Sequence, residues 1–282
     1  MTSGPGADAD SPAPKVSRAG RNLPAAIAVG VALVVMIAAS LVLLKQTFVA
    51  IVVVAMALGI DELRKALTTV GVAMPALPVQ LGSLAILLAA YLGGPDAMVV
   101  AVALTVLLTA LWRLRGGAPG YVRDVTSGVF TAIYVPFLAS FVLLMLRADD
   151  GQWQVATFIL VTIASDIGGY AAGVLFGRHP MAPTISPKKS WEGFAGSALT
   201  CGAAGWLGVV YFLDGVWWAG VLLGAITVVT ATLGDLTESV IKRDLGIKDM
   251  GQTLPGHGGL MDRLDSLLAT VPFAWMVMHF IV

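Results

Sequence analysis

The stretch LPAAIAVGVALVVMIAASLVLL, residues 23–44, decides the class of this protein. It carries no charge and, as a helix rising about 1.5 Å per residue, is long enough to cross a hydrocarbon core of about 30 Å. Basic residues precede it, as in a signal peptide, but the apolar core of a signal peptide has only about 7–15 residues. We therefore interpret 23–44 as a retained transmembrane helix, with a cleaved signal as the alternative.

The composition of the whole chain agrees with a membrane protein. Of its 282 residues, 57% are hydrophobic and 12% are charged, whereas about 25% of a soluble domain is charged. These values exclude a soluble globular enzyme, a disordered chain and a nucleic-acid binder with a basic surface. The single cysteine, Cys201, excludes a disulfide framework and any zinc site built from several cysteines.

Further apolar runs predict an all-α polytopic integral membrane protein, because backbone groups in the bilayer core must be satisfied within helices. We predict about nine transmembrane helices, the first at 23–44 and the others at 46–60, 78–94, 96–112, 127–146, 153–176, 195–213, 216–234 and 265–281. About five lie in an N-terminal part, 23–150, and the rest in a C-terminal part, 151–282. Residues 1–22, rich in Gly, Pro and Ala, are predicted to form a disordered tail. We find no internal repeat and no strand pattern outside the membrane.

Lys and Arg fall almost entirely on one side of this predicted topology. With the N-terminus inside, only Lys45 and Arg147 of the 17 basic residues lie in outer segments. Since cytoplasmic loops carry an excess of Lys and Arg, we predict a cytoplasmic N-terminus and a C-terminus outside. The long polar segments then face the cytoplasm, and the protein is expected in the cytoplasmic (plasma) membrane.

The richest polar segment is GDLTESVIKRDLGIKDMGQTLPGHGGLMDRLDS, residues 234–266. A helix over 235–247 would carry four polar side chains on one face: Asp235, Glu238, Ser239 and Lys242. Asp262 and Asp265 would share a face at the start of the last span, across a glycine-rich turn at 255–259. Carboxylates suit Mg²⁺ and basic side chains suit phosphates. A solvated mixed-charge loop is the alternative, which the scarcity of charge elsewhere disfavours.

Two other polar features lie upstream. The lysines of ISPKKSWEG, residues 185–193, fit a membrane anchor on anionic lipid or a phosphate site, and both interpretations stay open. Asp166 lies near the middle of the sixth predicted span. An ionisable residue there costs at least ~2.5 kcal/mol and normally faces a cavity or a partner. A protonated acid hydrogen-bonded inside the bundle is the alternative.

Residues 239–265 resemble the signature of phosphatidate cytidylyltransferases, also called CDP-diacylglycerol synthases. The matching pattern is Ser239-x-Ile241-Lys242-Arg243-x4-Lys248-Asp249-x-Gly251-x2-Leu254-Pro255-x-His257-Gly258-Gly259-Leu260-x-Asp262-Arg263-Leu264-Asp265. SPKKSWEG resembles a second element of the family, with Ser190 in place of the commoner Thr. Asp166–Tyr170 and Gly177-Arg178 resemble two more, although His179-Pro180-Met181 follows where relatives often carry Gly-Lys. The first 150 residues match only in hydropathy.

The resemblance implies a reaction of CTP with phosphatidic acid that gives CDP-diacylglycerol and pyrophosphate, a step of phospholipid biosynthesis. It implies that Mg²⁺ is required, with a second cation left open, and that the protein is a homodimer in the lipid bilayer. Such a transfer depends on positioning and on neutralising charge. No serine nucleophile with a base partner is evident, so we expect direct displacement without a covalent enzyme intermediate.

The expected site residues form three groups. The expected catalytic residues are Asp235, Lys242, Asp249, Asp262 and Asp166. The residues expected to bind substrate or phosphate are Ser186, Lys188, Lys189, Ser239, Arg243, Lys248, His257, Gly258, Gly259 and Arg263. The expected metal ligands are Asp235, Asp262 and Asp265.

Two rival functions differ in chemistry. A CTP-dependent polyprenol or dolichol kinase, which resembles this family more distantly, would transfer the γ-phosphoryl group and release CDP. A membrane transporter would move a solute without consuming CTP, and the inverted repeats common in transporters are not evident here.

Overall fold

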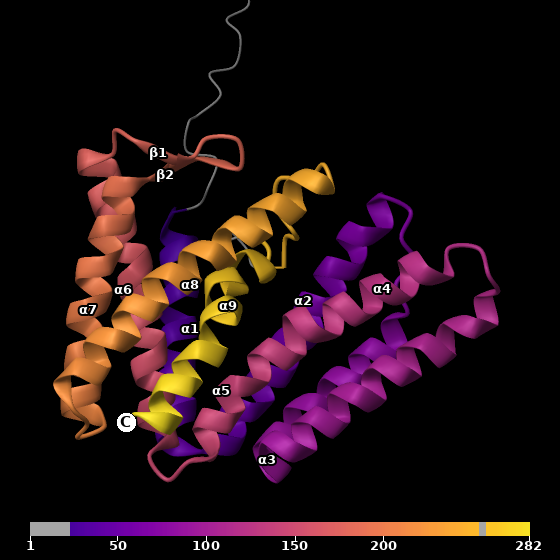
Figure 1. Ribbon diagram of the computed structural model, residues 1–282, viewed down its shortest axis with the longest axis horizontal. Coiled ribbons are helices and arrows are strands. Elements are labelled where there is room, and N and C mark those ends of the chain that lie inside the picture. The colour runs from indigo at the N-terminus through magenta and orange to yellow at the C-terminus, as the bar shows by residue number, and fades with distance from the viewer. Residues whose placement is uncertain (1–22, 254–257) are drawn as a thin grey trace, which may run out of the picture.

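The computed structural model describes residues 23–253 and 258–282 as a bundle of helices with one short ribbon (Figure 1). The tail 1–22 and His257 lie outside the described residues. The helices are α1 (Leu23–Leu43), α2 (Lys45–Thr69), α3 (Ala76–Arg113), α4 (Tyr121–Ala132), α5 (Leu138–Arg147), α6 (Gly151–Phe176), α7 (Trp191–Phe212), α8 (Trp217–Asp244) and α9 (Met261–Phe280). A 3-10 turn (Leu114–Gly116) follows α3, and a π-helical turn (Ile133–Phe137) joins α4 to α5.

Six helical runs among the described residues are long and apolar enough to cross a membrane. They are α2, Ala76–Gly116, Tyr121–Arg147, α6, α7 and α8. These runs confirm the expectation of an all-α polytopic membrane protein. The number of nine crossings and the orientation of the termini stay predictions.

The chain reverses direction inside α3. Gly94 adopts φ 81° and ψ −164° and precedes Pro95, so the helix breaks there. A Cβ atom on Gly82 would lie 2.2 Å from Thr105 Cγ2, although a straight helix would separate these residues by about 35 Å. The predicted spans 78–94 and 96–112 therefore form the two arms of this one element.

The segment between α6 and α7 contains a ribbon of two antiparallel strands, β1 (Pro180–Ala182) and β2 (Ser186–Ser190). The expectation of no strand outside the membrane was therefore wrong. The strands have three and five residues and each contains a proline, so the alternation that usually reveals a strand is missing. Contacts outside the ribbon hold it instead: Arg243 Nε of α8 donates to the Ile185 carbonyl at 2.6 Å.

Helices α6 and α7 pack closely at the level of Asp166. A Cβ atom on Gly168 would lie 2.1 Å from Thr200 Oγ1, so only glycine permits this approach. Ser197 Oγ of α7 donates to the Ser165 carbonyl of α6 at 2.7 Å. This contact fixes the two helices that carry the ribbon.

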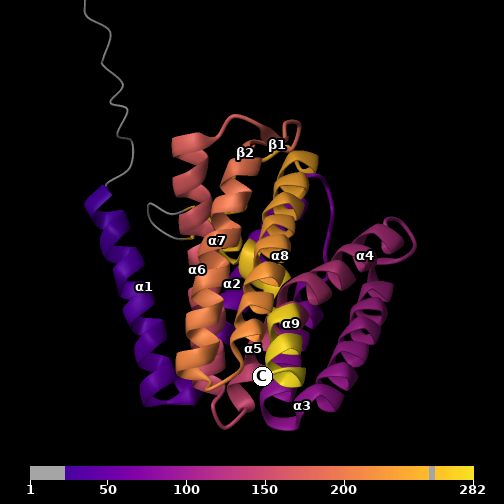
Figure 2. The same ribbon diagram turned by 60° about the vertical axis from the view of Figure 1, so that its left-hand side comes forward.

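The two ends of the bundle differ. The ribbon and the beginning of α1 lie at one end, and the C-terminus lies at the other (Figures 1 and 2). Helix α1 stands at the edge of the bundle (Figure 2), whereas α9 packs between α5 and α8, with Met261 and Ala274 fully buried. The polar first turn of α9 thereby comes to the same region as the polar end of α8.

Candidate active site

Two adjoining cavities, each of about 310 Å³, open where α6, α7, α8 and α9 meet the ribbon. The ribbon cavity is lined by Ser165, Asp166, Gly169, Tyr170, Gly173, Met181, Lys188, Lys189, Ser190, Gly193, Phe194, Ser197, Ala231, Thr232 and Asp235. The acidic cavity is lined by Asp166, Lys189, Asp235, Glu238, Ser239, Lys242, Asp262, Arg263, Asp265 and Ser266. Three charged residues, Asp166, Lys189 and Asp235, line both.

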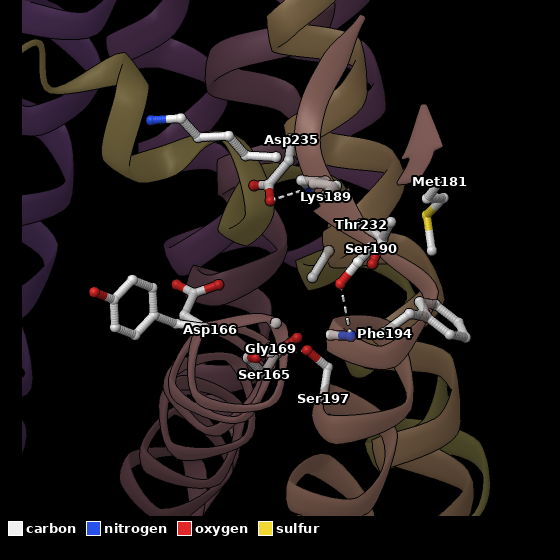
Figure 3. Close-up of a pocket in the computed structure, with 15 residues that line it drawn as sticks. Ser165, Asp166, Gly169, Met181, Lys189, Ser190, Phe194, Ser197, Thr232 and Asp235 are labelled. Atoms are coloured by element: carbon white, nitrogen blue, oxygen red, sulfur yellow. Dashed lines mark hydrogen bonds and ion pairs between the residues drawn. The ribbon is translucent and has the colours of Figure 1, made fainter. Parts of the chain in front are cut away.

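An ion pair marks the boundary between the cavities. Lys189 Nζ, from the ribbon, contacts Asp235 Oδ2, from α8 (Figure 3). The other oxygen of Asp235 accepts a hydrogen bond from Ser266 Oγ of α9. Figure 3 also shows the Asp166 carboxylate, from α6, pointing into the space below this pair. Four elements that are distant in sequence thus contribute to one polar centre.

Lys242 lies between two carboxylates of the acidic cavity. Its Nζ donates to Asp262 Oδ1 at 2.8 Å and also to Glu238 Oε2, one turn earlier in α8. Helix α8 continues to Asp244, so the expected polar face from Asp235 to Lys242 exists as predicted. An ammonium group shared by two acids fixes the relative position of α8 and α9.

Backbone amides hold the second oxygen of Asp262. Met250 N donates to Asp262 Oδ2 at 3.0 Å, and Gly259 N donates to the same oxygen at 3.1 Å. Gly258 adopts φ +86°, a conformation that favours glycine. Met250 and Gly259 therefore bring two backbone donors to a carboxylate at the beginning of α9.

The carboxylates of the acidic cavity have the chemistry of a Mg²⁺ site. Glu238 is 1% exposed, and its Oε1 has no hydrogen-bond partner among the described residues. Within the same part of the chain, no three His, Cys, Asp or Glu residues are arranged to hold a metal on their own. Mg²⁺ usually takes one or two carboxylates, with water and substrate phosphates as its remaining ligands. The residues present therefore fit that ion in the presence of a phosphate substrate.

Most of the expected site residues come together. Those that line a cavity are Asp166, Lys188, Lys189, Asp235, Ser239, Lys242, Asp262, Arg263 and Asp265. Those that lie outside both cavities are Ser186, Arg243, Lys248, Asp249, Gly258 and Gly259. Lys248 and Asp249 are exposed in the loop after α8. Arg243 contacts the ribbon, as described above, and His257 lies outside the described residues.

Three polar residues that contact the charged groups of this region or the backbone beside them were not among the expected site residues. Helical spacing placed Glu238 on the α8 face with Asp235, but no role was assigned to it. Ser266 follows Asp265 directly and contacts Asp235. Glu62 of α2 accepts hydrogen bonds from the backbone at the beginning of α9, and no local sequence signal could have revealed this contact.

Comparison with known proteins identifies the family. Residues 24–281 match the Cytidylyltransferase family. The chain is 46% identical over 284 residues to a phosphatidate cytidylyltransferase of Mycobacterium bovis, covering 95% of this chain and 92% of the relative. It is 43% identical to one of Mycobacterium leprae, covering 93% and 89%, and 32% identical to one of Synechocystis, covering 83% and 88%. Since the match extends over nearly the whole chain, this protein belongs to the Cytidylyltransferase family.

Proposed function

We infer that this protein transfers the cytidylyl group of CTP to phosphatidate, giving CDP-diacylglycerol and pyrophosphate. The relatives that share 43–46% of its residues over more than nine-tenths of the chain carry the name of that activity. The observation that carries the inference in the structure is the pair of cavities joined at Lys189 and Asp235. Two phosphate-bearing substrates need adjacent polar sites, and the cavities adjoin near one end of a membrane bundle.

The reaction is a direct displacement in this proposal. A phosphate oxygen of phosphatidate attacks the α-phosphorus of CTP, a new P–O bond forms, and the bond to the β-phosphate oxygen breaks. Pyrophosphate leaves with the bonding electron pair. Lys189, Lys242 and Arg263 line the acidic cavity and bind the phosphates, because catalysis of such transfers rests on positioning and charge neutralisation.

Asp235, Asp262 and Asp265 are the proposed Mg²⁺ ligands, with Glu238 as a further carboxylate of the same cavity. When bound, Mg²⁺ neutralises phosphate charge and orients the reacting groups. The chain's own residues prepare the carboxylates: Lys242 and two backbone amides fix Asp262, while Ser266 Oγ fixes Asp235. Asp166 lines both cavities, and in this proposal the lipid head group meets CTP beside it.

We propose further that the site faces the cytoplasm and that the chain crosses the membrane about nine times, as the Lys and Arg distribution predicts. The position of the ribbon at the bundle end opposite the C-terminus agrees with a cytoplasmic site and an outer C-terminus. The proposal also includes a homodimer, which the family resemblance implies, and a location in the cytoplasmic membrane.

One assay tests the function and separates it from its rivals. Protein purified in detergent is incubated with phosphatidate and CTP labelled at the α-phosphorus, with Mg²⁺ or with a chelator. We expect Mg²⁺-dependent label in the lipid fraction and release of unlabelled pyrophosphate. Label that appears only in CDP would indicate a kinase, and unconsumed CTP would contradict an enzyme of this kind. A cytidylyl group trapped on Ser266 would contradict direct displacement.

A further inference from the structure

Glu62 lies in the N-terminal half of the chain but contacts the beginning of the last helix. It is 3% exposed, and both of its carboxylate oxygens accept backbone hydrogen bonds. Leu260 N donates to Oε1 and Met261 N donates to Oε2, each at 2.9 Å, across 198 and 199 residues of sequence. A carboxylate buried this deeply would be strongly unfavourable without such partners.

Glu62 supplies hydrogen-bond acceptors to the backbone at the beginning of α9. The first amide groups of a helix have no partner within the helix, and Leu260, the residue before α9, provides no side-chain cap. The carboxylate of Glu62 satisfies these donors from α2. A negative charge is also favourable near the positive end of the helix dipole.

Glu62 also lies close to the backbone of two glycines that precede α9, Gly251 and Gly259. A Cβ atom on Gly251 would lie 2.5 Å from Glu62 Oε1, and one on Gly259 would lie 3.0 Å from Glu62 Oε2. The Gly259 amide that packs here donates to Asp262 Oδ2 at 3.1 Å. Glu62 and Asp262 therefore both bind the backbone of residues 259–261, and the position of Asp262 depends on this shared segment.

We propose that Glu62 is a positioning residue of the active site, which fixes the beginning of α9 so that Asp262 faces Lys242 and the acidic cavity. It lines neither cavity, so it acts through Asp262 and does not touch substrate. This inference rests on the proposed function of the acidic cavity. It assigns a role in that function to the half of the chain that carries no catalytic motif.

Asp124 provides a matched control. It is 1% exposed, accepts from Ala73 N at 3.1 Å and pairs with Arg113. It is thus a second buried carboxylate that holds backbone, but it lies outside both cavities. Asp124→Asn removes a buried charge without disturbing α9.

The experiment compares Glu62→Gln, Glu62→Asp and Asp124→Asn with the wild type. Glutamine keeps the size of Glu62 but replaces one carboxylate oxygen by an NH2 group. That NH2 group is a donor and cannot accept the hydrogen bond from Leu260 N or Met261 N. We expect hydrogen exchange at Leu260 and Met261 to become about tenfold faster in Glu62→Gln. The kcat should fall at least about tenfold, while the KM for phosphatidate changes by less than about threefold. Glu62→Asp should restore part of kcat, because it keeps the charge.

The results separate the positioning role of Glu62 from the proposed cytidylyltransferase function. Asp124→Asn should lower thermal stability but leave exchange at Leu260 and kcat as in the wild type. If the wild type is active and Glu62→Gln has the same kcat, the positioning role is overturned. A fall in kcat without faster exchange at Leu260 and Met261 also overturns it. If the wild type makes no CDP-diacylglycerol, the proposed function fails, and exchange alone then reports whether Glu62 holds α9. If Glu62→Gln does not reach the membrane, Glu62→Asp is measured instead. Exchange and kcat equal to those of the wild type in Glu62→Asp then overturn the positioning role.

Discussion

Lys242 Nζ lies 2.8 Å from Asp262 Oδ1, so one ammonium group joins α8 to α9 across the glycine-rich turn. Lys242 also contacts Glu238, and Asp262 also accepts two backbone amides. The polar ends of the two helices are therefore held in register by side chains that line the acidic cavity. In the proposed reaction this register brings carboxylates and bases to the same phosphates.

Asp262→Asn should abolish turnover while the protein stays folded. Asparagine keeps an oxygen for the two backbone amides, and Lys242 keeps Glu238 as a partner. The lost charge should lower kcat by at least about 100-fold, as expected for a group that stabilises charge in the transition state. The measurement is formation of labelled CDP-diacylglycerol, with membrane insertion and thermal stability as controls. Near-normal activity would show that Asp262 does not hold the metal.

Lys189→Met should weaken catalysis, because it removes the cation at the boundary between the two cavities. It removes the cation that pairs with Asp235 and lines both cavities. Because the proposed charge-assisted contact of Lys189 with phosphate would be lost, kcat/KM for phosphatidate should fall by at least about tenfold. Lys65→Met is the control, since Lys65 has a side chain that is 67% exposed and pairs only with Asp61 among the described residues. Equal activity of the two variants would exclude a role of Lys189 in substrate binding.

Local patterns predicted the features of the site that depend on spacing along one helix. Asp235, Ser239 and Lys242 line one cavity because residues three or four apart share a helical face. The hydropathy runs likewise predicted the helices, and the boundary between the predicted spans 78–94 and 96–112 corresponds to the reversal at Gly94. These features need no knowledge of how distant segments pack.

The remaining features depend on contacts between distant segments. Asp61 and Glu62 are adjacent and directly follow the predicted span 46–60. Successive helical residues point in different directions, so Asp61 pairs with Arg64 and Lys65 near the surface, while Glu62 points inward to α9. The contact of Arg243 with the Ile185 carbonyl could not be predicted either, because the two residues are 58 positions apart in the sequence.

Gly168→Ala should destabilise the contact of α6 with α7. The added Cβ would lie 2.1 Å from Thr200 Oγ1 and 2.7 Å from the Gly196 carbonyl oxygen. Because backbone cannot move away easily, we expect a loss of about 1–3 kcal/mol in the free energy of unfolding. Gly202→Ala in α7 is the control, since a Cβ there meets nothing within 4 Å and alanine favours a helix. Equal unfolding midpoints in detergent would contradict close packing at Gly168.

The orientation of the chain can be read from two engineered thiols. Asp149→Cys lies in the exposed loop between α5 and α6, and Ala118→Cys lies in the exposed turn before α4. The distribution of Lys and Arg predicts that 149 lies outside and 118 inside. A membrane-impermeant maleimide should therefore label Asp149→Cys in intact cells and Ala118→Cys only after permeabilisation. The wild type is a suitable background, because Cys201 is 0% exposed. The reverse pattern would turn the active site away from the cytoplasm, where CTP is supplied, and would contradict the proposed sidedness while leaving the reaction itself untouched.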